Sequence, residues 1–219
     1  MSRTYDIIIF DLDGTLADTA PDVAFGVNQA LHIMGFEPLK LEQVKKAVGP
    51  GREEFIRNIF PGVENPDTET FLTIFREIYW EHCLEKTVLF HGMEEVLTGL
   101  EALSLNVATN KPKVFTEKIL KGLGVRDRFD EVVGPEDVNH AKPDPEMIIK
   151  IVEDVGGEPT GTLLIGDTDR DILAGQRGGV GVCGARYGYG CNEDMESLHP
   201  DFFVDHPAEI LEIIENSHI

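Results

Sequence analysis

The chain has little positive charge, few cysteines and no long apolar run. Its 219 residues include 19 Lys and Arg against 40 Asp and Glu, a formal net charge of −21. Nucleic acids and anionic membrane surfaces select basic patches, so this charge balance argues against both as partners. No apolar stretch reaches the length of a membrane span. Residues 1–6 also lack the pattern of a signal peptide.

The cysteine count argues against a disulfide framework. Cys83, Cys183 and Cys191 are odd in number and widely scattered, which predicts reduced thiols and a cytoplasmic location. The two later cysteines lack a CxxC partner pair, so we expect structural thiols rather than metal ligands. The seven histidines show no HxxxH or HExxH spacing. A zinc site of the usual kinds is therefore not expected.

Short apolar runs alternate with helical patterns along most of the chain. Helical spacing with Pro and Gly punctuation separates most of the runs. The predicted strands cover residues 5–10, 105–108, 131–133, 162–165, 180–183 and 202–204. This alternation predicts an α/β fold whose core is a Rossmann-like, doubly wound parallel sheet.

One region breaks the alternation. From about residue 21 to 84 the apolar positions follow helical periodicity, and no convincing strand is found. We therefore expect an all-helical subdomain inserted after the first strand. The predicted division places the core at 1–17 and 86–219, and the helical insertion at 18–85.

Two acids follow the first predicted strand in the segment DLDGTL. Asp11 and Asp13 are two positions apart, so in an extended chain their side chains point the same way. Two buried neighbouring carboxylates need a cation or a proton to compensate them. The alternatives are a simple turn or a calcium loop. The EF-hand pattern fails because its twelfth position is Asp22 and the apolar Leu16 interrupts the ligands.

Three further polar groups follow other predicted elements. Thr109 and Asn110 end one strand, Lys142 lies in the segment AKPDP, and Asp167 and Asp171 belong to the segment GDTDRD. Alone, each has a simpler interpretation: a capped turn, a surface lysine, or the N-cap of a helix. Together they follow the strand ends at which open parallel sheets build their sites. The oxygen-only donor set favours Mg²⁺.

These motifs carry a family resemblance. The segments DLDGTL at 11–16, TN at 109–110, KPDP at 142–145 and GDTDRD at 166–171 resemble the haloacid dehalogenase-like superfamily of phosphatases, in the same order and over the whole chain. The helical insertion resembles the small cap of that family. Within it the chain looks most like phosphoglycolate phosphatases. The segments FHGM at 90–93, YGYG at 187–190 and PDFFVD at 200–205 support this.

The resemblance implies roles for the acids. Asp11 would be the nucleophile that forms an aspartyl-phosphate, and Asp13 would be the general acid and base. Mg²⁺ would be held by the Asp11 carboxylate, the Asp13 backbone carbonyl and Asp167, with Asp171 behind this shell. Relatives that are dehalogenases lack the acid at the second position. The presence of Asp13 therefore favours phosphate-ester hydrolysis or phosphoryl transfer.

The remaining candidates concern the substrate, a small phosphorylated metabolite. Thr109, Asn110 and Lys142 would hold the phosphoryl group, and we hypothesise that Arg52 in the cap reaches the other end of the substrate. A solvated arginine is the alternative for Arg52. Phosphoglycolate is the first substrate to test. A sugar-phosphate mutase, a pyrophosphatase and a catalytically silent binding module remain alternatives, and we expect a monomer or homodimer.

One stretch near the C-terminus carries acidic residues but no basic ones. Residues 187–219 contain eight Asp and Glu and neither Lys nor Arg. A solvated acidic surface is the expected interpretation.

Overall fold

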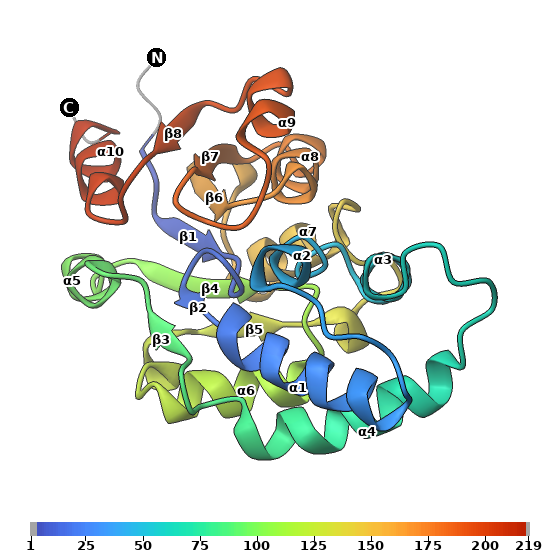
Figure 1. Ribbon diagram of the computed structural model, residues 1–219. Coiled ribbons are helices and arrows are strands. Elements are labelled where there is room, and N and C mark those ends of the chain that lie inside the picture. The colour runs from blue at the N-terminus through green and yellow to red at the C-terminus, as the bar shows by residue number, and fades with distance from the viewer. Residues whose placement is uncertain (1–3, 218–219) are drawn as a thin grey trace.

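The computed structural model describes residues 4–217, which are arranged around a six-stranded sheet (Figure 1). Its strands are β1 (Ile7–Phe10), β4 (Ser104–Ala108), β5 (Glu131–Val133), β6 (Thr162–Gly166), β7 (Gly181–Ala185) and β8 (Phe202–Val204). The order across the sheet is β5-β4-β1-β6-β7-β8, and all neighbours are parallel. The predicted α/β class with a doubly wound parallel sheet is confirmed.

Helices cover both faces of this sheet (Figure 1). They are α5 (Met93–Gly99), α6 (Lys113–Gly122), α7 (Glu146–Asp154), α8 (Asp169–Gly178), α9 (Asn192–Ser197) and α10 (Glu209–Ser217). Short 3-10 turns lie at Arg126–Arg128, Pro135–Asp137 and Pro159–Gly161. The sequence patterns indicated α5, α6 and α7, whereas the short α9 and the last helix, α10, were not predicted.

The central strand β1 explains why both faces must be covered. Ile7 and Ile9 pack with residues of α7 and α8, while Ile8 and Phe10 pack with residues of α5, α6 and α10. All four side chains are buried. A strand buried on both sides is a continuous apolar run, because alternate side chains point to opposite faces. That run is the signal by which the sequence predicted it.

Four helices fill the region predicted for the cap. They are α1 (Ala20–Ile33), α2 (Leu41–Lys45), α3 (Arg52–Ile59) and α4 (Thr68–His82). Residues 20–82, which the structure describes in full, form no strand. The aromatic stripe of α4 holds the helices together: Phe71 and Phe75 are stacked at 6.0 Å, and Phe60 meets Phe71 edge-on at 5.0 Å. The boundaries at 18 and 85 stay a prediction.

A two-stranded ribbon lies where the chain leaves the core and returns to it. Its antiparallel strands are β2 (Ala17–Asp18) and β3 (Val88–Leu89), and the sequence did not predict them. Beside it, the buried carboxylate of Asp22 accepts bonds from the backbone N–H groups of Lys86 and Thr87 and from the Thr87 hydroxyl, at 2.9–3.1 Å. The start of α1 is thus tied to the chain that returns from α4.

No helix among residues 4–217 is both long and apolar enough to cross a lipid bilayer. Met1 to Arg3, on which the expectation about a signal peptide partly rests, lie outside the described residues, as does His218.

Asp22→Ala tests the bonds by which the start of α1 is tied to Lys86 and Thr87. The change leaves two backbone N–H groups without their buried acceptor, so we expect a loss of about 2–4 kcal/mol in the free energy of unfolding, measured by urea denaturation. Asp67→Ala, which removes the exposed N-cap acceptor of α4, is the control and should cost less. Equal losses for the two variants would contradict a structural role for the buried carboxylate.

Candidate active site

The predicted site residues follow strands that end at the same edge of the sheet. Asp11 follows β1, Thr109 follows β4 and Asp167 follows β6. These three strands are adjacent and parallel, so their carboxyl ends lie together. Lys142 comes from the loop before α7, and Asp171 comes from the first turn of α8. The fold therefore brings together groups that are up to 160 positions apart in the sequence.

The buried ammonium of Lys142 bonds three acceptors of the site. Its ammonium lies 2.9 Å from Asp11 Oδ1, 2.6 Å from Asp171 Oδ1 and 2.7 Å from the carbonyl oxygen of Ala108. The side chain is 2% exposed, so these three acceptors replace its water shell. The other oxygen of Asp171 accepts bonds from the N–H and hydroxyl of Thr168, at 3.0 and 2.6 Å. Lys142 and Asp171 are therefore fixed in place.

Three buried carboxylates gather around this lysine. Oxygens of Asp11, Asp167 and Asp171 lie within 4.8 Å of one another. Burial raises the pKa of Asp11 to about 6, and the nearby Asp171 and Asp13 add to the rise while Lys142 opposes it. Burial and the Asp11 charge raise the pKa of Asp167 well above its usual range. The protein alone does not neutralise this group of acids.

One lysine is too little positive charge for three acids. Burial by itself lowers the pKa of Lys142, but Asp11 and Asp171 outweigh it and hold that pKa above its ordinary value, so the ammonium stays charged. Three carboxylates and one ammonium leave an excess of negative charge in a buried place, which a divalent cation would offset. The oxygen donors fit a hard cation such as Mg²⁺.

Backbone groups of two segments lie directly against the Asp167 carboxylate. Its Oδ1 accepts the Thr15 hydroxyl at 3.0 Å, and its Oδ2 accepts the N–H groups of Tyr189 and Gly190 at 2.7 and 3.3 Å. A Cβ on Gly14, which has a φ of +86°, or on Gly188 would overlap Asp167 Oδ2. Glycine is therefore required where the first motif and the YGYG segment enclose this carboxylate.

Asp13 has partners of its own, apart from Lys142. Both of its oxygens bond the Lys111 ammonium, at 3.0 and 3.1 Å, and Oδ1 also accepts the Thr19 hydroxyl at 2.5 Å. The Lys111 ammonium also lies 4.8 Å from the centre of the Tyr79 ring. Sequence reasoning missed Lys111. The available signal was its position, directly after Thr109 and Asn110 in the segment TNK.

The two residues after β4 have different surroundings. Thr109 is buried, and its hydroxyl accepts the N–H of Lys111 at 3.2 Å. The Asn110 amide donates to the carbonyls of Lys142 and Gly49, both at 3.0 Å, so it bonds the core to the loop before α3. Its own oxygen is buried and has no hydrogen-bond partner among the described residues. Asn110 thus lies at the boundary between core and cap.

Further bonds hold the cap against the core. The Glu54 carboxylate on α3 pairs with Arg170 on α8. The Tyr189 hydroxyl donates to Asp18 at 2.6 Å and accepts the backbone N–H of Ala20 at 3.0 Å, where α1 begins. Together with the Asn110 bond, these contacts place α1 and α3 over the strand ends. The cap therefore covers the site.

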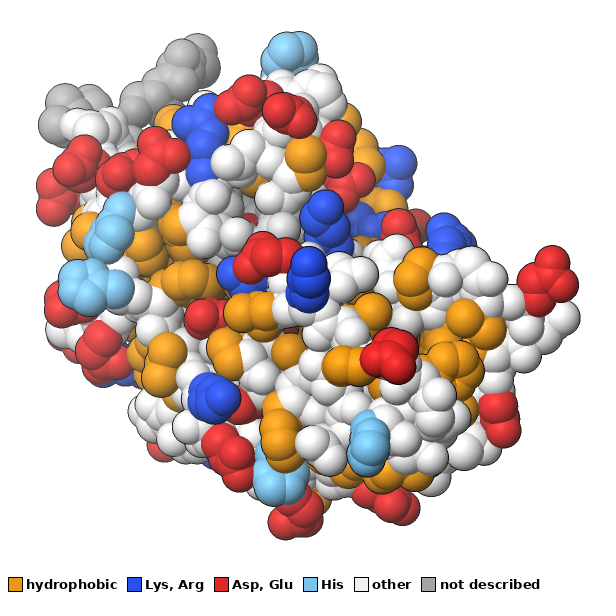
Figure 2. Space-filling view, in the orientation of Figure 1, with side chains coloured by type: hydrophobic (Ala, Val, Ile, Leu, Met, Phe, Trp, Pro, Cys, Tyr) orange, Lys and Arg blue, Asp and Glu red, His pale blue; other side chains and the backbone are white. Residues whose placement is uncertain are grey.

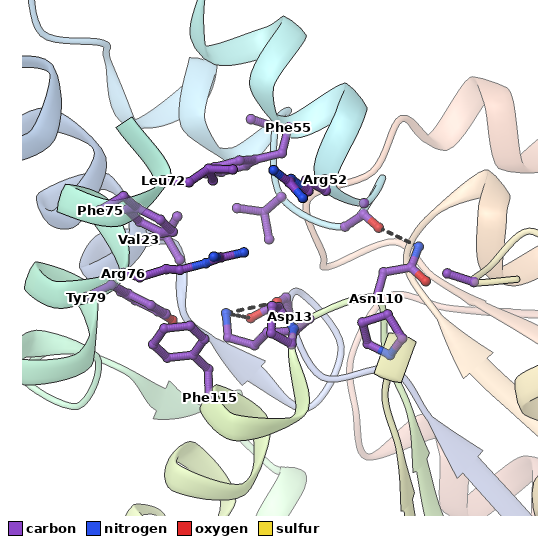
Figure 3. A pocket seen from close by; sticks show the side chains of 18 of the residues that line it. Asp13, Val23, Arg52, Phe55, Leu72, Phe75, Arg76, Tyr79, Asn110 and Phe115 are labelled. Carbon is purple, nitrogen blue, oxygen red and sulfur yellow. Dashed lines mark hydrogen bonds and ion pairs between the residues drawn. The ribbon is translucent and has the colours of Figure 1, made fainter. Parts of the chain in front are cut away.

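A pocket of about 430 Å³ lies between the cap and the core (Figure 3). Its floor includes Asp13, Asn110 and Lys111 from the core, and its walls come from α1, α3, α4 and α6. Arg52 lines the pocket, but its guanidinium is paired with Glu69 at 2.5 Å and its side chain is 58% exposed, so its contact with a substrate stays a prediction. Arg76 of α4 also lines the pocket and was not predicted. Its signal was a charge within the helical stripe that Leu72 and Tyr79 share.

Many acidic side chains lie on the surface outside this site. Figure 2 shows Asp and Glu side chains scattered over the visible face, on the core and on the cap, rather than gathered in one patch. Several of the 40 acids are instead buried: Asp11, Asp13, Asp22, Asp167 and Asp171 are each at most 5% exposed. The net charge is thus no guide to the local charge at the site.

Comparison with known proteins agrees with this geometry. The model of the haloacid dehalogenase-like hydrolase family matches residues 8–185. The chain is 34% identical to the N-acetylmuramic acid 6-phosphate phosphatase of Pseudomonas aeruginosa, over 96% of this chain and 95% of the relative. It is 32% identical to the phosphoglycolate phosphatase of Aquifex aeolicus, over 96% and 97% of the two chains.

A solved structure also resembles this chain closely in fold. The crystal structure of a predicted phosphoglycolate phosphatase from Haemophilus somnus matches with a TM-score of 0.89 at 29% identity, over 95% of this chain and 97% of that one. The resemblance inferred from the four motifs is confirmed. Since the family model spans most of the chain and relatives above 30% identity cover nearly all of it, the chain belongs to the haloacid dehalogenase-like hydrolases.

Proposed function

We propose that this hydrolase is a Mg²⁺-dependent phosphatase that cleaves small phosphate monoesters through an aspartyl-phosphate on Asp11. The observation that carries the proposal is the buried group of Asp11, Asp167 and Asp171, in which the single ammonium of Lys142 pairs with Asp11 and Asp171. Such a group is costly unless a cation and an anionic substrate complete it. Its position beneath the cap pocket supports a reaction on a bound small molecule.

The cation would be held by the carboxylates of Asp11 and Asp167 and by the backbone carbonyl of Asp13. When bound, Mg²⁺ supplies positive charge that lets an anionic nucleophile approach an anionic phosphate. Asp171 would orient Lys142, to which it is bonded at 2.6 Å. Thr15 and the backbone of Tyr189 keep Asp167 in place through the bonds described above.

The phosphoryl oxygens would be held by Thr109 and Lys142, with Asn110 beside them. Lys142 is suited to this because its charge is retained and its position is fixed by Asp11 and Asp171. Thr109 directly follows the adjacent strand β4, so it lies at the same edge of the sheet. The three groups come from two different strand-end loops, which gives the phosphoryl group one defined orientation.

In the first step a carboxylate oxygen of Asp11 attacks phosphorus and the bond from phosphorus to the alcohol oxygen breaks. Asp13 gives its proton to that oxygen, and the alcohol leaves. In the second step Asp13 takes a proton from water, the water oxygen attacks phosphorus, and the bond from Asp11 to phosphorus breaks. Inorganic phosphate leaves and both aspartates are regenerated. Asp13 lines the pocket, as this role requires.

Phosphoglycolate is the leading candidate substrate, and the relatives add N-acetylmuramic acid 6-phosphate as a second. Both alcohols carry a carboxylate, so both would need a cation at the far end of the pocket. Arg52, at the pocket, is one candidate for that contact. We propose that the enzyme acts in the cytoplasm as a monomer or homodimer. Its three cysteines are free thiols, as a reducing compartment permits.

A phosphate-release assay tests the reaction class. The panel would contain phosphoglycolate, N-acetylmuramic acid 6-phosphate, other sugar phosphates, nucleotides and pyrophosphate, each with Mg²⁺ or with EDTA. We expect release from monoesters with Mg²⁺ and its loss in EDTA, because the acids are left without their cation. Preferred cleavage of pyrophosphate, conversion between sugar-phosphate isomers, or no reaction at all would each contradict the proposal and favour a pyrophosphatase, a mutase or a binding module.

Asp11→Asn tests the nucleophile. The amide cannot form the phosphoryl intermediate, so we expect kcat to fall at least about a thousandfold. The control is Asp169→Asn, which changes an exposed acid of the fourth motif and should retain activity. Substantial turnover by the Asp11 variant, measured after its fold is checked by circular dichroism, would show that another group is the nucleophile.

Arg52→Ala tests the sequence-derived contact to the substrate. Since Arg52 is mostly exposed and already paired with Glu69, we expect a modest loss, about three- to tenfold in kcat/KM for carboxylate-bearing esters. Steady-state assays over the same panel measure it. An unchanged kcat/KM for every preferred substrate would assign Arg52 to the solvated surface.

A further inference from the structure

The cap pocket is larger than its leading candidate substrate needs. The leaving group of phosphoglycolate is a methylene with a carboxylate, on the order of 100 Å³ if each water-sized group takes about 30 Å³. The pocket holds about 430 Å³, within the range of sites that enclose much larger organic ligands. Phosphoglycolate would therefore leave most of it to water.

Most of the pocket wall is apolar and aromatic. The cap contributes Phe55, Leu72 and Phe75, and the core contributes Phe115. In Figure 3 these side chains surround the open space on the cap side of Asp13. A wall of this kind favours a ligand with an apolar or ring-shaped body, because burying that body removes apolar surface from water.

Among these apolar groups the pocket has one cation without a partner. Lys111 is bonded to Asp13, and Arg52 is bonded to Glu69. The guanidinium of Arg76 forms no hydrogen bond or ion pair with any other residue of the described chain, 4–217, and Figure 3 shows it reaching from α4 into the pocket above Asp13. The nearby Glu136 accepts the backbone N–H of Lys113 instead. Arg76 is thus the pocket cation that is free to bind an anion.

One buried polar atom of the pocket also lacks a partner. The Asn110 side-chain oxygen is buried without a hydrogen bond among the described residues, whereas the buried Tyr79 hydroxyl has the Lys111 ammonium beside it. Burial raises the pKa of Tyr79 above its usual value, so the phenol remains a donor. Unsatisfied buried polar atoms are costly. The Tyr79 hydroxyl can donate a hydrogen bond, the Asn110 oxygen can accept one, and the Arg76 guanidinium can bind an anion. A polar, anionic ligand in this cavity would bond all three groups.

We propose that the pocket binds the alcohol part of a phosphate monoester in which a ring-shaped body separates the phosphate from a carboxylate, and that Arg76 binds this carboxylate and sets specificity. The ring packs against the aromatic wall, and its hydroxyl or amide groups bond Tyr79 and Asn110. The proposal rests on the proposed phosphatase function, and within it a carboxylated ring ester replaces phosphoglycolate as the leading candidate substrate. It assigns the main anion contact to Arg76 rather than to Arg52.

Two sugar phosphates that differ in one group test this. N-acetylmuramic acid 6-phosphate is N-acetylglucosamine 6-phosphate with a lactyl carboxylate added. For the unmodified enzyme we expect kcat/KM to be at least about tenfold higher for the first, since a charge-assisted bond is worth about that much. We also expect both phosphoglycolate and the sugar without the carboxylate to be poorer substrates than the carboxylated sugar.

Arg76→Gln should reduce the preference for the carboxylated sugar by roughly ten- to hundredfold. The control is Arg57→Gln, an exposed arginine of α3 that does not line the pocket, which should keep the preference. Arg76 makes no bond that the fold needs, and thermal denaturation verifies that both variants are folded.

The proposal would be overturned by equal kcat/KM for the two sugar phosphates, by an unchanged preference in Arg76→Gln, or by a higher kcat/KM for phosphoglycolate. A greater loss of preference in Arg52→Gln than in Arg76→Gln would move the anion contact to Arg52 and overturn the assignment. If no ester at all releases phosphate with Mg²⁺, the proposed function itself has failed, which is a different outcome.

Discussion

The bonds of the Lys142 ammonium to Asp11 and Asp171 are the constraint on which the site depends. A lysine that is 2% exposed is stable only because two carboxylates and one carbonyl replace its water. The acids need the lysine for the same reason, yet with Asp167 they outnumber it. This imbalance leaves an excess of negative charge at the edge of the sheet, which a cation would offset. The α/β core supplies what the bonds require, since β1, β4 and β6 end side by side.

The rest of the molecule encloses this edge. On one side the YGYG segment lies so close to Asp167 that glycine is needed at Gly188 and at the facing Gly14. On the other side the cap reaches the core through the bond of Asn110 to Gly49 and the pair of Glu54 and Arg170. The acids are therefore buried, whereas a cavity lies beneath the cap. Under the proposed function, the core would carry out the reaction and the cap pocket would recognise the alcohol.

Charge acts at two scales in this protein. Over the whole surface the excess of acids favours solubility and repels polyanions. Within the site two of the acids are paired locally, Asp13 with Lys111 and Asp11 with Lys142. The eight acids of residues 187–219 fall mainly on and around α9 and α10. They form part of the outer surface rather than of the site.

The sequence by itself determined the sheet, its insertion and the motifs that follow its strands. Those features are local: an apolar run such as Ile7–Phe10, a Pro or Gly at an element end, two acids two positions apart. Only the tertiary structure decided which side chains pair. Nothing local indicates that Lys111 bonds Asp13, 98 positions away, that Asp171 shares Lys142 with Asp11, or that Arg52 is paired while Arg76 is free. The reason is physical, because strand ends are fixed by backbone pairing, whereas ion pairs and pocket walls depend on how distant helices pack.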